Sequence, residues 1–180
     1  MKVVSIVGMA GAGKTEVARI FEKHGFKRIR FGDITDEEIK KRGLTLNEAS
    51  ECLVREQLRK EQGMDAYARL NLARIDEARK NSDVVIDGLY SWEEYTFLKE
   101  YYGPDFYVVA VWSAPETRYA RLTSRQNRRL TLEEAASRDR TEIENVNKAG
   151  PITMADFTII NESSLQELRK QTEQILAGLK

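Results

Sequence analysis

Four residues near the start of the sequence have the types and spacing needed to bind a polyphosphate. Gly8, Gly13, Lys14 and Thr15 follow the pattern G-x-x-x-x-G-K-T, the Walker A motif or P-loop. The glycines allow the backbone to curl around phosphates with its N–H groups pointing inward, the lysine reaches the β- and γ-phosphates, and the threonine hydroxyl faces Mg²⁺. The alternative is a glycine-rich turn that binds nothing.

The residues on both sides of this motif favour the phosphate-binding interpretation. Residues 3–7 suit a buried parallel strand, and a helix is expected from about Lys14 to His24. Because a helix N-terminus carries partial positive charge, it favours a bound phosphate. We therefore expect the nucleotide to contact Gly8, Ala10, Gly11, Ala12, Gly13, Lys14, Thr15 and Glu16.

Two aspartates follow predicted strands at positions that would face the phosphates. Asp87 closes the strand predicted for residues 83–87, where it would orient Mg²⁺ together with Thr15, directly or through water. Asp33 follows the strand predicted for residues 27–31, where it would take the proton of an acceptor hydroxyl or hold the acceptor by hydrogen bonds. The alternatives are a turn or capping aspartate for Asp87, and for Asp33 the cap of a short helix beginning near Thr35.

Arginines are concentrated between residues 118 and 140. Guanidinium groups stabilise the negative charge of a migrating phosphoryl group, so we expect a compact lid of two helices over about residues 115–140. Arg121, Arg125 and Arg138 are the expected catalytic arginines, and the first two share a helix face. The alternatives are a solvated basic surface or contact with RNA. The full set is Arg118, Arg121, Arg125, Arg128, Arg129, Arg138 and Arg140.

The order of predicted elements indicates an α/β protein. Strands are expected at residues 3–7, 27–31, 83–87, 106–112 and 157–160, with helices between them, which predicts a three-layer α/β/α sandwich with a five-stranded parallel sheet. A length of 180 residues suits a single domain, here residues 1–180. A helical insertion at about residues 34–80, with a break near Gly63, would stand above the carboxyl edge of the sheet and form one wall of an acceptor site.

Composition narrows the classes of partner. Lys plus Arg and Asp plus Glu are both 29, so neither a stable nucleic-acid complex nor membrane binding is expected. The chain is 41% hydrophobic without an apolar run near the ~20 residues that span a bilayer, and it starts with a strand rather than a signal peptide. A single cysteine, Cys52, fits a reducing compartment, so a cytoplasmic location is expected, with the thiol in the core.

With these residues in place, the sequence resembles the nucleoside and nucleotide kinase branch of the P-loop fold. It looks closest to adenylate-kinase-related proteins of archaea and to dephospho-coenzyme A kinases. The resemblance implies ATP with Mg²⁺ as donor, Arg121 against the adenine, Arg125 against phosphate and Asn161 beside the adenine. It rests on residues 8–15, 31–33, 86–88, 121 and 125, 138–140, and 160–161, which occur in the order of the family.

Two positions depart from the adenylate kinase pattern. Adenylate kinases carry an arginine three residues after the aspartate matched by Asp33, and this chain has Asp36 there. Where they read D-G-F-P-R, residues 87–91 read D-G-L-Y-S. Two arginines that grip a monophosphate acceptor are therefore missing. The candidates to replace them are Arg42, Arg55, Arg69 and Arg74, with Arg69 preferred for its place in the second insertion helix.

Together these features predict an ATP-dependent kinase, monomeric or homodimeric, that transfers the γ-phosphoryl group to a small nucleotide-like acceptor. The competing prediction is an ATP-dependent switch or slow ATPase that acts on a protein or RNA partner without a small acceptor. The sequence leaves the acceptor and the choice between ATP and GTP open.

Overall fold

The sheet lies at the centre of the molecule. The computed structural model describes residues 1–126 and 128–179. Within them, a five-stranded, all-parallel sheet has the order β2-β3-β1-β4-β5. Each strand lies within one residue of its predicted bounds. The strands are β1 (Val3–Val7), β2 (Lys27–Arg30), β3 (Val84–Asp87), β4 (Phe106–Trp112) and β5 (Phe157–Ile160).

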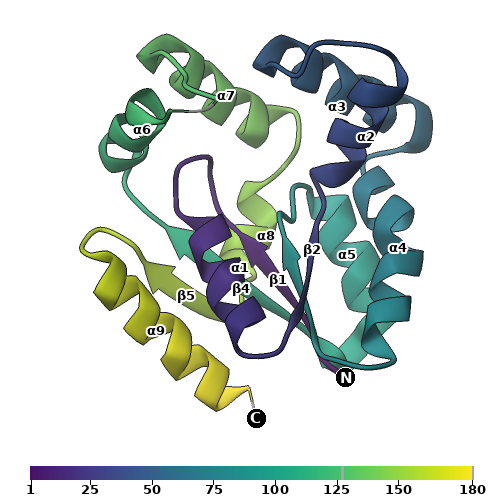
Figure 1. The fold of residues 1–180 in the computed structure, drawn as a ribbon, viewed down its shortest axis with the longest axis vertical. Coiled ribbons are helices and arrows are strands. Elements are labelled where there is room, and N and C mark those ends of the chain that lie inside the picture. The colour runs from purple at the N-terminus through teal and green to yellow at the C-terminus, as the bar shows by residue number, and fades with distance from the viewer. Residues whose placement is uncertain (127, 180) are drawn as a thin grey trace.

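Helices cover both faces of the sheet and extend beyond its carboxyl edge (Figure 1). One face packs against α1 and α9, and the other against α4, α5 and the short α8. The predicted three-layer α/β/α sandwich is therefore confirmed. The helices are α1 (Lys14–Lys23), α2 (Asp33–Lys41), α3 (Glu48–Gln62), α4 (Ala66–Arg79), α5 (Trp92–Tyr102), α6 (Pro115–Ser124), α7 (Leu132–Glu144), α8 (Ala149–Thr153) and α9 (Leu165–Gly178), with a 3₁₀ turn η1 (Gly103–Asp105) before β4.

The strand order creates the crevice in which open parallel sheets bind ligands. The chain leaves β1 for the edge strand β2, returns through β3, and then crosses to β4 on the other side of β1. All five residues of β1 are buried, because helices cover it from both faces. The carboxyl ends of β1, β3 and β4 therefore meet at the switch point, where the P-loop begins.

The insertion predicted for residues 34–80 divides into two parts. Helices α2 and α3 rise above the carboxyl edge of the sheet, as expected (Figure 1). Helix α4 instead packs on the sheet, with Tyr67 and Ile75 fully buried in the core against β3. The second helix of the expected hairpin, α4, is thus part of a helical layer that covers the sheet. Helices α2 and α3 form the predicted wall above the carboxyl edge.

The lid predicted for residues 115–140 corresponds to α6 and α7. Helix α7 begins with a capping box, in which the Thr131 hydroxyl accepts from the Glu134 amide and the Glu134 carboxylate accepts from the Thr131 amide. The helix continues to Glu144. Among the described residues, none of the helices combines the length and apolar character needed to cross a membrane.

Candidate functional site

The loop between β1 and α1 has the backbone conformation that its sequence predicts. Gly8, Gly11 and Gly13 have φ angles of 152°, 82° and 104°, which side chains rarely tolerate. A Cβ on Gly8 would lie 2.3 Å from the carbonyl oxygen of Val111, and one on Gly13 would lie 2.4 Å from Nδ2 of Asn161. The loop is therefore held against β4 and the end of β5 at distances that only glycine permits.

This loop presents a row of free backbone donors. The Ala12 amide donates to the Met9 carbonyl at 3.2 Å, which closes the turn. Among the residues that the structure describes, the amides of Gly11, Gly13, Lys14 and Thr15 donate to no protein acceptor. Consecutive free amides at a helix N-terminus form a concave site for a phosphate group.

Lys14 folds back over the loop. Its Nζ donates to the carbonyl oxygens of Gly8 at 2.8 Å and Met9 at 3.0 Å. Burial, with a contribution from the nearby Lys148 ammonium, lowers the pKa of Lys14 to about 7. Bound phosphate would replace the two carbonyls and restore the charge.

The neighbours of Lys14 in the first turn of α1 are more exposed. The side chain of Thr15 is exposed, and the carboxylate of Glu16 forms a 2.6 Å ion pair with Arg19 on the helix surface.

Asp87 lies at the carboxyl end of β3 next to β1, in register with Ile6. The residue is buried, and its Oδ2 accepts from Nη2 of Arg28 on β2 at 2.5 Å, an ion pair that the sequence did not reveal. Its Oδ1 accepts no hydrogen bond from the described residues. No cluster of three or more metal-binding side chains occurs in those same residues. One carboxylate oxygen and the Thr15 hydroxyl fit a Mg²⁺ ion that draws its remaining ligands from phosphates and water.

Asn161 and Arg121, which the resemblance places at the adenine, lie together beside the loop. Nδ2 of the buried Asn161 donates to the Ala12 carbonyl at 2.8 Å, and Nη2 of Arg121 donates to the Asn161 carbonyl at 2.9 Å. Nη1 of Arg121 also donates to the hydroxyl of Ser113 at 3.0 Å. The end of β5 and the first lid helix are thus joined at the P-loop.

Arg118 belongs to the same arginine run but has a structural environment. It is buried and forms a two-pronged pair with Asp139 of α7, at 2.9 and 2.6 Å. Its Nη1 also donates to the Ala10 carbonyl of the P-loop at 3.1 Å. Arg118 therefore connects the loop to both lid helices, and its donors are engaged by the protein itself.

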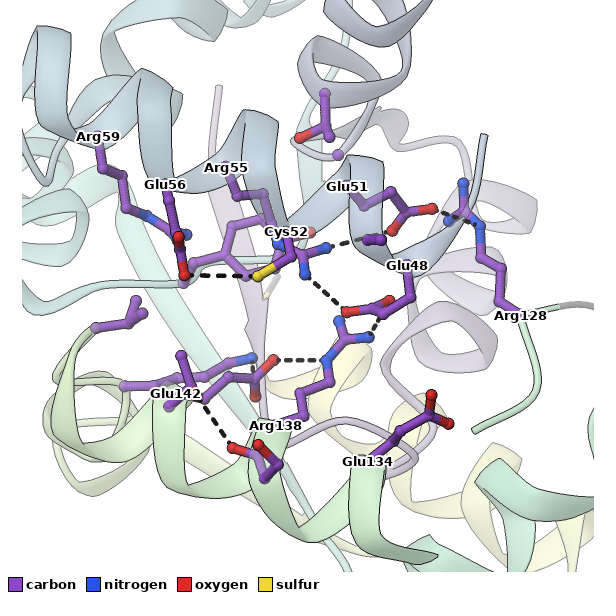
Figure 2. A pocket seen from close by; sticks show the side chains of 18 of the residues that line it. Glu48, Glu51, Cys52, Arg55, Glu56, Arg59, Arg128, Glu134, Arg138 and Glu142 are labelled. Carbon is purple, nitrogen blue, oxygen red and sulfur yellow. Dashed lines mark hydrogen bonds and ion pairs between the residues drawn. The ribbon is translucent and has the colours of Figure 1, made fainter. Parts of the chain in front are cut away.

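A pocket of about 560 Å³ opens between α2 and α3 on one side and α7 with the segment before α8 on the other (Figure 2). Ion pairs line it: Arg55 with Glu48 at 2.8 Å, and Arg138 with Glu48 and Glu142, both at 3.2 Å. Lys148, 1% exposed, pairs with Glu142 at 2.8 Å. The volume suits a nucleotide-sized ligand.

Side chains from the lid close the mouth of this pocket. Arg128, which has a φ of 55°, forms ion pairs with Asp36 of α2 at 3.2 Å and Glu51 of α3 at 3.0 Å. Arg138 makes a second bridge to Glu48. Arg125 is exposed as a residue and has no ion pair with any described residue, and partial desolvation of its guanidinium with the charges of Arg138 and Arg128 lowers its pKa. It does not line the pocket, so the lid arginines that bridge to α2 and α3 there are Arg128 and Arg138.

The two aspartates after β2 have different surroundings from those predicted. Helix α2 begins at Asp33 itself, with Gly32 as its N-cap, so Asp33 does not cap a helix starting near Thr35. Its carboxylate accepts from Arg30 at 2.8 Å. Asp36, which occupies the position of a missing family arginine, lines the pocket and also binds Arg30.

Two expectations about other side chains are wrong. Arg69 is exposed on α4, where it pairs with Asp65 at 2.6 Å and lies 4.6 Å over the Phe97 ring, outside the pocket lining. Cys52 is half-buried in the pocket wall rather than in the core, with its Sγ 3.5 Å from Glu56. Cys52 lies on α3 and Arg69 on α4. The rotation of each helix relative to the sheet determines whether its side chains face the core, the pocket or solvent, and sequence spacing does not give that rotation.

Sequence reasoning also missed several pocket residues, notably Arg59, Glu142 and Lys148. Glu142 and Lys148 are six residues apart across the end of α7, and no local motif marks them. The one signal in the sequence for these pocket residues was Lys148, which follows the predicted end of the lid by about eight residues.

Comparison with known proteins identifies the family. A family model described as an AAA domain matches residues 4–145. A UPF0200 protein of Thermococcus onnurineus is 33% identical over 178 residues, covering 97% of this chain and 96% of that one. A UPF0200 protein of Thermococcus gammatolerans is 36% identical over 185 residues, covering 98% and 97%.

The chain belongs to the AAA-domain family and to the UPF0200 proteins.

Solved structures confirm the fold of this AAA-domain protein. TT1252 from Thermus thermophilus superposes with a TM-score of 0.67 at 20% identity, covering 99% of this chain and 98% of that one. A shikimate kinase from Bacteroides thetaiotaomicron gives 0.61 at 15% identity, covering 99% and 98%. The predicted resemblance to P-loop kinases is thereby confirmed at the level of the fold.

Proposed function

We propose that this protein is an ATP-dependent phosphotransferase that acts on a small, nucleotide-like acceptor. The observation that carries the proposal is the meeting of the P-loop with the pocket. Arg118 joins the Ala10 carbonyl of the loop to Asp139 of α7, and Arg138 and Glu142 of the same helix line the pocket. We therefore expect a nucleotide bound by the loop to direct its γ-phosphate toward the pocket.

The proposed reaction needs little covalent chemistry from the protein. The acceptor oxygen bonds to the γ-phosphorus, the bond to the β,γ-bridging oxygen breaks, ADP leaves, and the acceptor proton passes to Asp33 or to solvent. Lys14, Arg125 and Arg138 would stabilise the charge on the migrating group. Bound by Thr15 and Asp87, Mg²⁺ would neutralise phosphate charge, while Arg121 and Asn161 would flank the adenine.

The fold neighbours support a small acceptor. Solved structures with this fold carry the names shikimate kinase and gluconokinase, the latter from Sinorhizobium meliloti with a TM-score of 0.59 at 15% identity. A pocket of about 560 Å³ beside a short lid suits such molecules better than a protein partner.

The test is a screen of ADP release with Mg²⁺ and ATP, repeated with GTP. Candidate acceptors are AMP, CMP, UMP, dephospho-coenzyme A, gluconate, shikimate and simple sugars. The proposal expects one of them to stimulate ADP release at least tenfold and to yield a phosphorylated product. ADP release stimulated only by protein or RNA, without a phosphorylated small molecule, would replace this proposal with the nucleotide switch.

A further inference from the structure

One cation in the pocket wall, Arg59, forms no ion pair with any described residue. Arg59 lies on α3, one to three turns from Arg55, Cys52 and Glu48 on the wall that faces the pocket (Figure 2). Its side chain is half-buried, and it forms neither an ion pair nor a hydrogen bond with any residue in the described ranges. Its Nε is fully buried and unpartnered.

The other cations that line the pocket differ from Arg59. Arg55 pairs with Glu48 and Glu51, Arg138 with Glu48 and Glu142, and Lys148 with Glu142, all within 3.2 Å. Those guanidinium and ammonium groups are therefore neutralised by the protein. A guanidinium that is partly removed from water without a partner costs free energy, which a ligand anion would recover.

Two acids near Arg59 form no ion pair with it. Glu56, one turn earlier on α3, is exposed and accepts from the Cys52 thiol. Glu94 is fully buried and does not line the pocket; its Oε1 has no partner among the described residues, and burial raises its pKa to about 7 although the charge of Arg59 opposes this shift. The guanidinium instead lies 5.4 Å over the ring of Tyr67. This aromatic contact holds the group in place and leaves its N–H donors for a ligand.

We propose that Arg59 anchors an anion subsite in this pocket, and that the acceptor is a small molecule with a phosphate or carboxylate group besides the atom that is phosphorylated. The inference rests on the proposed function. Arg59 would then replace the acceptor-binding arginines of adenylate kinases. Those arginines occupy the positions that are Asp36 and Ser91 in this chain. A guanidinium binds either anion through paired N–H donors.

The first test compares matched acceptors that differ in charge but keep the same hydroxyl groups for phosphorylation, such as shikimate with its methyl ester, and includes gluconate with glucose. Only an anionic member should stimulate ADP release. For that acceptor, Arg59→Ala should raise KM about 10- to 100-fold, the loss expected for a charged hydrogen bond, with little change in kcat or in the KM for ATP. Arg59→Lys should recover part of the loss, and Arg69→Ala, on the exposed surface of α4, should behave as wild type.

The second test does not need turnover. With the P-loop saturated by Mg²⁺ and a non-hydrolysable ATP analogue, millimolar sulfate should raise the thermal midpoint of wild type and Arg69→Ala equally, and that of Arg59→Lys by less. Arg59→Ala should lose that rise.

The outcomes separate the two proposals. If no acceptor stimulates the wild type, the proposed function fails and the sulfate titration alone decides the subsite. Neutral acceptors used as well as their anionic partners, or equal sulfate effects in wild type and Arg59→Ala, would overturn the anion subsite while leaving phosphotransfer intact.

Discussion

The proposed donor end, at the P-loop, and the proposed acceptor end, at the pocket, are built differently. At the donor end the binding groups are backbone amides in a loop of eight residues, fixed by glycines that touch β4 and Asn161. At the acceptor end they are ionised side chains from α2, α3, α7 and the segment before α8, held by one another. The contrast suggests that the donor end is rigid before ligand arrives, whereas the acceptor end depends on how well its charges are compensated.

The largest effect is expected where the two ends are joined. Arg118→Ala would leave the buried carboxylate of Asp139 without its partner and release the Ala10 carbonyl, at a cost of about 3–5 kcal/mol in the free energy of unfolding. Urea denaturation measures this loss. Arg140→Ala, exposed on the same helix as Asp139, is the matched control and should cost less than about 0.5 kcal/mol. Equal free energies of unfolding for the two variants would contradict the inference that Arg118 links the P-loop to the lid.

At the donor end, Lys14→Ala should lower ATP turnover about 100- to 1000-fold, because one charge directed at the phosphates is removed. The variant should stay folded, since Lys14 makes hydrogen bonds to only two carbonyls, those of Gly8 and Met9, in the described structure. Circular dichroism checks the fold, and Arg19→Ala on the outer face of α1 is the control. Wild-type turnover in Lys14→Ala would remove the donor assignment.

Substitution of glycine tests whether the donor end is rigid. Gly25→Ala and Gly13→Ala both place alanine at a φ near 100°, which costs about 1–2 kcal/mol. The Cβ at Gly25 meets no atom within 4 Å, whereas that at Gly13 meets Asn161 at 2.4 Å. Gly13→Ala should therefore lose at least about 1 kcal/mol more in urea and bind ATP more weakly. Asn161→Ala added to Gly13→Ala removes the clashing side chain and should restore part of the free energy of unfolding. Equal losses for Gly13→Ala and Gly25→Ala would instead show that the P-loop shifts to accommodate the added Cβ.

The pH dependence of ATP binding gives the smallest effect. The free protein has a Lys14 pKa of about 7, below its usual value, and bound phosphates raise it. Binding above pH 7 should therefore take up a proton, and affinity should fall by up to about tenfold for each pH unit. Calorimetry in two buffers of different ionisation enthalpy measures the uptake. Lys14→Arg, which stays charged, should abolish it, and uptake that persists in this variant would assign the proton to another group.

The same contrast explains which features the sequence could predict. The strands, the P-loop and the position of Asp87 follow from local patterns, because a buried parallel strand and a glycine loop depend on residues adjacent in the chain. The pocket depends on how α3 and α4 turn relative to the sheet. Cys52 therefore lies in the pocket wall instead of the core, and Arg69 points away from the pocket. Sequence spacing alone did not distinguish buried Arg118 from the more accessible Arg121 and Arg125.

The ion pairs from Arg128 and Arg138 across the pocket mouth give the lid an unusual response to heat and salt. Ligand exchange must break guanidinium–carboxylate contacts that dissolved ions weaken, so added salt should speed product escape. Hydration of charged groups becomes less favourable on warming, so the desolvation penalty of these ion pairs falls. The ion pairs across the pocket therefore strengthen with temperature relative to apolar contacts. Turnover limited by lid opening would then rise less steeply with temperature than the chemical step, a difference that rapid-quench kinetics at several temperatures would measure.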